Sequence, residues 1–269
     1  MEPDIYHIFQ SIAPRYDRAN TVISMGMHRR WKGRMVRTLS QMIPKDSRIL
    51  DLCCGTGDIA WMFLKEGDSF QVTAADFSPN MLSEAGRKLS GLPGEARYCL
   101  VQADAMALPW REETFDAAVI SFGLRNTPDW NRVLREMVRV TKTGGIVCVM
   151  DAHYPENIWV QRAFSLYFTW LMPVLGGGRK HRREYGWLNR SAKAFADVPR
   201  LMGMMKEAGL IHRRYKRFLF GSCVYQLGEK ANKRKGTQDD GGPDGRGAGT
   251  CRAVFEAVHG GLETKRAVK

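Results

Sequence analysis

A short apolar run that ends in an acid leads directly into a glycine-rich turn. The run covers residues 48–52 (RILDL), and the turn places Gly55-Thr56-Gly57 shortly after Asp51. In open α/β sheets, ligands bind outside the carboxyl ends of the strands, and glycines there let backbone amides approach a ligand closely. The segment therefore predicts a small-molecule site at the end of a strand.

Two further acids end the next predicted strands. Asp76 ends the second strand, where a carboxylate accepts hydrogen bonds from ribose hydroxyls. Asp104 ends the third strand, where it can accept from an exocyclic amine such as that of adenine. The alternative is that Asp51 caps the following turn and Asp76 caps the next helix. The predicted cofactor-binding residues are Asp51, Gly55, Thr56, Gly57, Asp76, Phe77, Asp104, Ala105 and Ser121.

The sequence of this site is compatible with two nucleoside cofactors. Residues 55–60 (GTGDIA) satisfy the G-x-G-x-x-G/A pattern of dinucleotide-binding turns, which supports an NAD-dependent oxidoreductase. Asp51 opposes that choice, because a carboxylate beside the turn repels a pyrophosphate and attracts the ammonium or sulfonium of S-adenosylmethionine. The three acids together favour S-adenosylmethionine. A basic adaptor without catalysis is a third interpretation, and the intact set of acids and glycines opposes it.

The elements that must position these residues alternate between strand and helix. Such alternation predicts a parallel sheet covered by helices on both faces. A final pair of strands then suggests an antiparallel hairpin at the end of a seven-stranded, mostly parallel sheet. The predicted strands are 48–52, 71–75, 98–101, 117–122, 146–150, 211–219 and 222–227, and the predicted helices between them are 58–65, 79–89, 130–140 and 199–207, with residues 142–145 closing the third of these helices.

Three segments lie outside this alternation. Residues 1–47 have a helical and basic pattern, and an apolar, aromatic helix is predicted over 158–175. The glycine-rich end of the chain lacks apolar periodicity. We predict one domain over residues 1–230, with 1–45 and 155–195 covering the substrate, and a flexible basic tail over 231–269.

The charge and the cysteines bear on partners and location. The net charge is +13, which suggests an anionic partner. Basic stretches at 179–183 and 213–217 are either solvated surface or contacts with an anionic membrane, and no nucleic-acid signature accompanies them. The six cysteines lack metal-binding spacing, so no metal is expected, and they suit a reducing cytoplasm. We expect a cytoplasmic protein that contacts the membrane from its inner face.

The motifs resemble those of the ubiquinone/menaquinone biosynthesis C-methyltransferases of the UbiE/MenG type. The resemblance implies the class I methyltransferase fold, S-adenosylmethionine, and methylation of a ring carbon of a polyprenylated quinol. It favours demethylmenaquinol over the benzoquinol precursor of ubiquinone. The segments that carry it include 9–20 (FQSIAPRYDRAN), 24–32 (SMGMHRRWK), 49–58 (ILDLCCGTGD), 75–82 (ADFSPNML), 103–109 (ADAMALP), 120–126 (ISFGLRN), 185–191 (YGWLNRS) and 204–210 (MMKEAGL).

The chemistry of this reaction assigns roles to residues in these segments. A quinol carbon becomes nucleophilic when its neighbouring hydroxyl loses a proton, so the site needs a proton acceptor and a cation. Arg125 is placed to supply the cation, and a water oriented by Arg125 and Asn126 is the expected proton acceptor. Tyr16 is expected either to close over the site or simply to pack.

One segment departs from the family pattern. After the fifth strand the family carries a Glu-Phe-Ser-Lys-Pro-like sequence, where this chain has residues 151–155 (DAHYP). Asp151 keeps the acid, and the lysine is lost. His153 is the histidine beside a predicted strand end, which makes it a second candidate for the proton acceptor.

Overall fold

The computed structural model describes Ala13 and residues 16–67, 69–92, 97–155, 157–166 and 190–232. The chain divides into two units, Met1–Ala231 and Asn232–Lys269, and the fold below belongs to the first. Nearly all of the predicted tail, the beginning of the segment 1–47 and most of the segment 155–195 lie outside the described residues. The proposed division into domain, covering elements and tail therefore stays a prediction.

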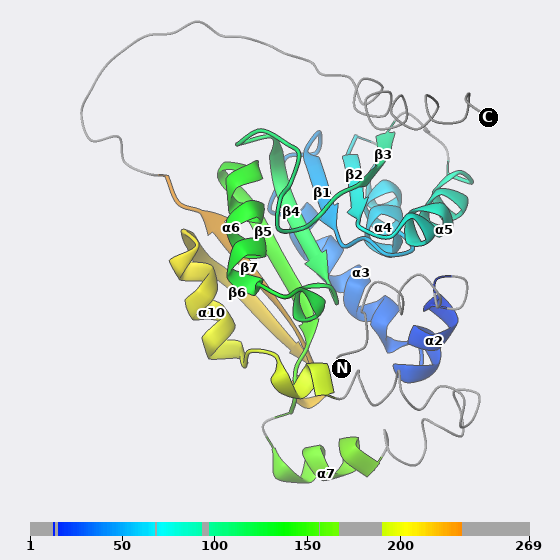
Figure 1. Cartoon of the computed structure of the whole chain (residues 1–269), viewed down its shortest axis with the longest axis vertical. Coiled ribbons are helices and arrows are strands. Elements are labelled where there is room, and N and C mark those ends of the chain that lie inside the picture. Colours follow the sequence, from blue (N-terminus) through cyan, green and yellow to red (C-terminus); the bar gives the residue numbers. More distant parts are fainter. Residues whose placement is uncertain are drawn as a thin grey trace, which may run out of the picture. The chain divides into compact units, whose positions relative to one another are not determined.

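A seven-stranded sheet forms the centre of the first unit (Figure 1). Its strand order is β3-β2-β1-β4-β5-β7-β6. The first five strands are parallel, and β7 runs antiparallel to both β5 and β6, which confirms the predicted sheet and its final hairpin. The strands are β1 Arg48–Leu52, β2 Gln71–Asp76, β3 Tyr98–Gln102, β4 Phe115–Ser121, β5 Thr141–Ala152, β6 Leu210–Phe218 and β7 Cys223–Lys230.

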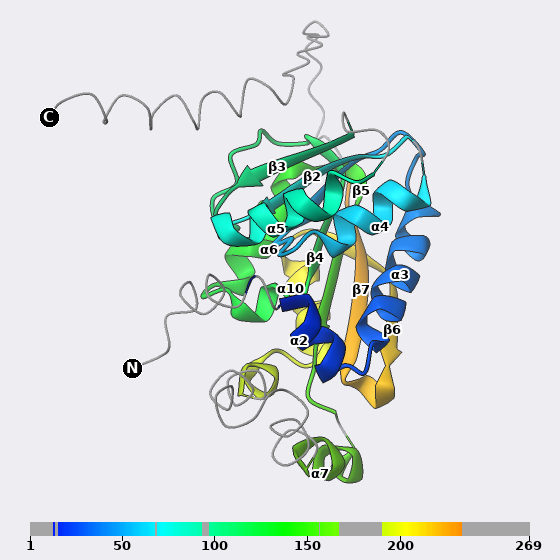
Figure 2. The same cartoon turned by 90° about the vertical axis from the view of Figure 1, so that its right-hand side faces the viewer.

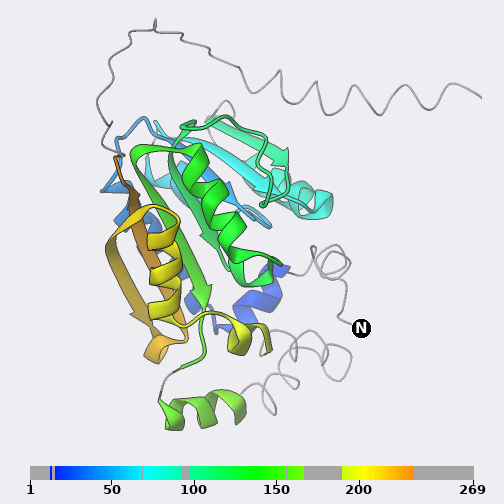
Figure 3. The ribbon, with the colours of Figure 1, turned by 60° about the vertical axis from the view of Figure 1, so that its left-hand side comes forward.

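Helices cover both faces of the sheet. Helices α3, α4 and α5 lie on the face seen in Figure 2, and α6 and α10 lie on the face seen in Figure 3. Strands β1 to β3 are added toward one edge of the sheet and β4 toward the other, so the strand order reverses between β1 and β4, where ligands bind in such sheets. The helices are α2 Tyr16–Ile23, α3 Met27–Ser40, α4 Asp58–Glu66, α5 Pro79–Leu89, α6 Trp130–Val140, α7 Ile158–Leu166 and α10 Val198–Glu207, with short 3-10 turns η3 Leu124–Asn126 and η6 Leu219–Gly221.

The central strands are buried on both faces, which fixes the carboxyl end of the sheet rigidly. Strand β4 is mostly apolar, residues 146–150 of β5 are apolar and buried, and β1 is buried after Arg48, as expected of parallel strands between two helical layers. One apolar cluster lies under α3 and α4, and a second lies under α6 and α10. The strand ends that carry the predicted acids therefore rest on two packed cores.

β5 differs from the prediction at both of its ends. It begins at Thr141, so the residues expected to close the preceding helix belong to the strand. A side chain at position 145 would clash with the neighbouring strand, because an added Cβ on Gly145 would lie 2.7 Å from the Asp116 carbonyl oxygen. At the other end, antiparallel pairing with β7 extends the strand through Asp151 to Ala152.

Two further observations concern the periphery. The predicted helix over 158–175 is described only as α7, Ile158–Leu166, and the remainder lies outside the described residues. Among the helices that the structure describes, none is both long and apolar enough to cross a membrane.

Candidate active site

The turn after β1 is held by backbone contacts and by glycines in left-handed conformations. The Cys54 N–H donates to the Ala75 carbonyl (3.0 Å), and the Gly57 N–H donates to the Cys54 carbonyl (2.9 Å). Gly57 has φ +78°, and a Cβ there would lie 3.1 Å from the Cβ of Ala85 in α5. Glycine is required at this position on both counts, since L side chains rarely adopt this conformation. The turn therefore packs the start of α4 closely against α5.

Asp51 is buried within β1 and faces the start of α4. Its Oδ2 accepts the Ala60 N–H (3.0 Å), so it satisfies a donor of the first turn of α4 rather than capping its own turn. Burial raises the pKa of Asp51 to about 7, and the nearby Lys32 opposes that rise. The carboxyl is thus poised to change charge near neutral pH, and a bound cation would favour its ionised form.

Affinity for S-adenosylmethionine is expected to rise between pH 5 and pH 7. Below the Asp51 pKa of about 7, binding a cation beside this carboxyl must displace its proton, so affinity climbs by up to about tenfold per pH unit and then levels off. Asp76, whose pKa burial also raises, adds a dependence of the same sign. Calorimetric titration across this range measures the effect, with Asp51→Asn as the control whose profile should be flatter. A flat wild-type profile would remove Asp51 from the donor site.

Asp76 ends β2 and ties the glycine turn to the start of α5. Its Oδ2 accepts the Gly55 N–H (2.8 Å), and its Oδ1 accepts the Ser78 N–H (3.0 Å). The N-cap of α5 is Ser78, whose hydroxyl accepts the Met81 N–H (3.3 Å), so the alternative that Asp76 itself caps this helix is wrong. Asp76 instead organises the turn that is expected to cradle the ligand.

The remaining predicted donor-site residues continue along the same edge of the sheet. Phe77 follows Asp76, and its carbonyl accepts from the Gln102 side chain (3.0 Å) at the end of β3. Asp104 is exposed, and its Oδ1 accepts the Met106 N–H (2.8 Å), while Ala105 is buried. Because β1, β2 and β3 are parallel neighbours, their carboxyl ends bring Asp51, Asp76 and Asp104 to one edge, as the sequence predicts.

The turn after β4 touches the turn after β1. Ser121 ends β4, and the Phe122 N–H donates to the Met150 carbonyl (2.7 Å). A Cβ on Gly123 would lie 2.6 Å from the Cβ of Cys53, so only glycine lets the two turns meet. This contact brings the glycine turn after β1 beside the segment that carries Arg125 and Asn126.

Arg125 lies in η3 and is paired with a buried carboxylate. Its guanidinium Nη1 bonds both the Asp151 Oδ1 and the Phe122 carbonyl, and its backbone N–H donates to the Asp151 Oδ2 (3.1 Å). The side chains of Arg125 and Asp151 are only 5% and 0% exposed. Asp151 therefore matches the charge of Arg125 and fixes the direction of its guanidinium.

Unmatched polar atoms gather at the carboxyl ends of β4 and β5. Among the described residues, five buried side-chain polar atoms have no hydrogen-bond partner, and four of them lie here. Native proteins rarely leave such atoms unsatisfied without a ligand, water or function to meet them. The four atoms are Ser121 Oγ, Arg125 Nε, Asn126 Oδ1 and His153 Nε2, and the fifth is Gln226 Oε1 on β7.

Helix α2 lies over the glycine turn. A Cβ on Gly55 would lie 3.7 Å from the Tyr16 ring, so this ring covers the turn. The Thr56 hydroxyl donates to Asp17 (2.5 Å), and the other Asp17 oxygen pairs with Lys88 of α5 (2.6 Å). Thr56, predicted to bind the cofactor, thus has its side chain engaged with α2.

The α2 contact continues into a chain of ion pairs that sequence reasoning missed. Lys88 also pairs with Asp58 (2.6 Å), and Asp58 pairs with the buried Lys32 of α3 (3.0 Å). Burial alone would raise the pKa of Asp58, but Lys32 and Lys88 outweigh it and lower that pKa well below its usual range. The pairs join residues 26 to 71 positions apart, so spacing gave no signal for them.

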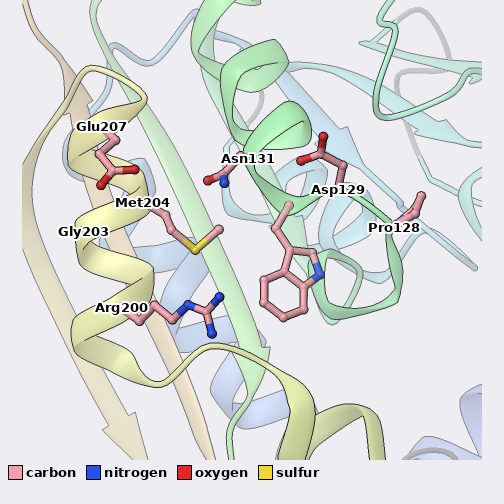
Figure 4. A pocket seen from close by; sticks show the side chains of 8 residues that line it. Pro128, Asp129, Asn131, Arg200, Gly203, Met204 and Glu207 are labelled. Atoms are coloured by element: carbon pink, nitrogen blue, oxygen red, sulfur yellow. The ribbon is translucent and has the colours of Figure 1, made fainter.

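A groove of about 620 Å³ lies between the start of α6 and α10 (Figure 4). Trp130 is one of the residues that line the groove, and the Arg200 guanidinium lies 6.0 Å from its ring. None of the predicted site residues lines this groove, so it is separate from the strand-end site. The described residues also hold no group of three or more His, Cys, Asp or Glu side chains that could bind a metal.

The residues of the donor site fit S-adenosylmethionine. A buried carboxyl beside the turn suits a cation, and turn amides fixed on Asp76 suit close approach of a nucleoside. The fold and this site together define a class I methyltransferase that depends on S-adenosylmethionine. The chain belongs to the ubiE/COQ5 methyltransferase family, whose profile matches residues 1–230. The resemblance noted from the motifs is therefore confirmed.

Curated relatives match over nearly their full length. A demethylmenaquinone methyltransferase of Bacillus pumilus is 37% identical over 233 residues, which cover 85% of this chain and 97% of the relative. The protein of the same name from Listeria monocytogenes is 37% identical over 235 residues, covering 87% and 98%.

Solved structures show the same fold at low identity. A SAM-dependent methyltransferase of Thermotoga maritima has a TM-score of 0.57 at 19% identity, covering 84% of this chain and 99% of that one. The [4+2]-cyclase SpnF also has a TM-score of 0.57, at 17% identity, covering 74% and 80%. Because a cyclase shares the fold, the reaction must be argued from the site and the close relatives.

Proposed function

We propose that this enzyme methylates a ring carbon of demethylmenaquinol, a polyprenylated quinol. The observation that carries the proposal is the match to demethylmenaquinone methyltransferases over 85% of the chain. The polar atoms left unmatched beside the donor turn agree with it, since a quinol hydroxyl both donates and accepts hydrogen bonds.

In this proposal the residues divide between the two ligands. Asp76 accepts from the ribose hydroxyls, Asp104 from the adenine amine, and Asp51 favours the cationic end of the methyl donor. The bound donor supplies an electrophilic methyl group. Arg125 and Asn126 hold the quinol hydroxyl, and Tyr16 covers the site from α2. Holding the two reactants in line supplies much of the rate.

We further propose that the enzyme meets its substrate at the cytoplasmic face of an anionic membrane. The turn between β6 and β7 presents Leu219 and Phe220, and Phe220 is 78% exposed. The preceding strand β6 carries a basic run, residues 213–217. Apolar side chains beside cations suit an anionic lipid surface, where each cation adds about 1 kcal/mol of attraction.

The experiment that tests the function offers the full-length enzyme two quinols. Reduced demethylmenaquinol and the demethylated benzoquinol precursor of ubiquinone are presented in vesicles with labelled S-adenosylmethionine, and the products are identified by mass spectrometry. We expect label on the ring carbon of the naphthoquinol, and a higher rate when the vesicles contain anionic lipid. Label only in the benzoquinol would overturn the choice of head group. Equal rates on neutral vesicles would contradict the membrane contact.

A further inference from the structure

His153 has a buried ring with only one of its two nitrogens satisfied. It follows β5 and is 3% exposed. Its backbone N–H donates to the Ser222 carbonyl (3.0 Å), and its Nδ1 lies 3.0 Å from the Ala196 carbonyl oxygen. The ring packs against Phe195 at a centroid distance of 5.2 Å. These contacts hold the ring in one orientation.

The bond at Nδ1 decides what Nε2 can do. A carbonyl oxygen only accepts, so Nδ1 must carry the hydrogen, and in the neutral ring Nε2 keeps an open lone pair. That nitrogen is buried and has no partner among the described residues. Burial lowers the pKa of His153, so the ring is neutral at pH 7 and ready to accept a proton.

The charged groups around the ring favour such an acceptor. Asp151 of β5 and Asp197 before α10 both favour the protonated ring, and Arg125 of η3 opposes it. Asp151 thus faces both the guanidinium and the imidazole, so it can stabilise a proton that arrives on His153. The Arg125 Nε–H is an unmatched donor after β4 and His153 Nε2 is an unmatched acceptor after the neighbouring β5, and a hydroxyl group can bond to one of each.

On the basis of the proposed function, we infer that His153 Nε2 is the proton acceptor for the quinol hydroxyl. The O–H bond breaks, its proton moves to Nε2, and its electron pair stays on the oxygen beside the Arg125 guanidinium. The ring carbon next to that oxygen then gains the methyl group and loses its own hydrogen as a proton, and the oxygen regains a proton from His153. One proton is released per turnover, together with S-adenosylhomocysteine. Of the two proton acceptors that the sequence suggested, an oriented water and His153, this inference chooses the side chain.

The test compares His153→Asn with His153→Ala in the full-length enzyme. The asparagine amide can replace Nδ1–H as the donor to the Ala196 carbonyl, and it has no counterpart of Nε2. We expect kcat at saturating donor and quinol to fall on the order of a hundredfold in both variants, as for loss of a general base. The Kd for S-adenosylhomocysteine should stay within about twofold of wild type. The matched control is His212→Asn, since His212 is an exposed histidine on β6.

Two readouts separate proton transfer from a structural role. Added imidazole should restore part of kcat to His153→Ala, and the fall in wild-type kcat at acid pH, below the ordinary pKa range of a histidine, should disappear in both variants. Recovery of wild-type kcat in His153→Asn would show that the Ala196 hydrogen bond is the whole contribution of the ring and would overturn the inference. An acid-side fall in kcat that persists unchanged in both variants would overturn it too. Failure of the proposed function is distinct, because wild-type enzyme would then leave the naphthoquinol unmethylated.

Discussion

Arg125→Ala is expected to lower kcat by on the order of a hundredfold or more while the Kd for S-adenosylhomocysteine stays unchanged. If Arg125 stabilises the phenolate oxygen, its interaction strengthens in the transition state, and such a residue lowers turnover without weakening donor binding. The size follows from the loss of one fixed donor to a developing oxyanion. Both quantities are measured on the same folded preparation.

The structure predicts that Arg125→Ala also lowers the stability of the folded protein. Removing the guanidinium leaves Asp151 buried without its partner, which destabilises by about 3–5 kcal/mol. The double variant Arg125→Ala with Asp151→Asn removes the stranded charge, so it should regain much of the lost stability without regaining kcat. Arg125→Lys should recover only part of kcat, because an ammonium lacks the rigid fork. Near-normal kcat per folded molecule in Arg125→Ala would show that the pair with Asp151 is purely structural.

Asp76→Ala is expected to raise the Kd for S-adenosylmethionine roughly 5- to 150-fold. The donor's ribose hydroxyls would lose a shared acceptor, which costs about 1–3 kcal/mol. The same change strips the Gly55 N–H of its partner, so the glycine turn loses an anchor as well. Calorimetry with the donor and with S-adenosylhomocysteine should show similar losses, since both carry the same ribose.

Asp116→Ala provides the matched control for that measurement. Asp116 also accepts a backbone N–H, that of Arg48, but it does so near the amino end of β1. The Asp116→Ala substitution should therefore lower stability somewhat and leave the Kd for S-adenosylmethionine within about twofold of wild type. An unchanged Kd in Asp76→Ala would remove Asp76 from the donor site.

The fold was predictable where apolar pattern and capping agree. Helix α6 matches its predicted limits, and Asp129 caps its first turn by accepting the Arg132 N–H (2.9 Å). The prediction is wrong for residues 142–145, where two glycines suggested a break. Gly145 instead allows β5 to lie close to β4. This requirement follows from the pairing of the two strands, so the local sequence does not show it.

The arrangement of the acids in the candidate donor site was predictable from the sequence, and the contacts of the residues around it were not. Acids at the ends of parallel strands share an edge whatever the loops between them do, so sequence position alone brings Asp51, Asp76 and Asp104 together. The pairing of Asp17 with Lys88 depends on how α2 folds over the turn. Likewise, Lys32 belongs to a run of basic residues in the sequence, yet it is buried against Asp58.

Strand β6 lies at one edge of the described sheet, and the residues on this edge affect how readily copies of this enzyme aggregate. An unpaired strand edge is a template on which another chain can add a strand. Here the edge carries Arg213, Arg214, Lys216 and Arg217, so two such edges brought side by side would set like charges against one another. The resulting repulsion opposes edge-to-edge aggregation, and it would matter most where many copies are concentrated, as on the membrane surface proposed above.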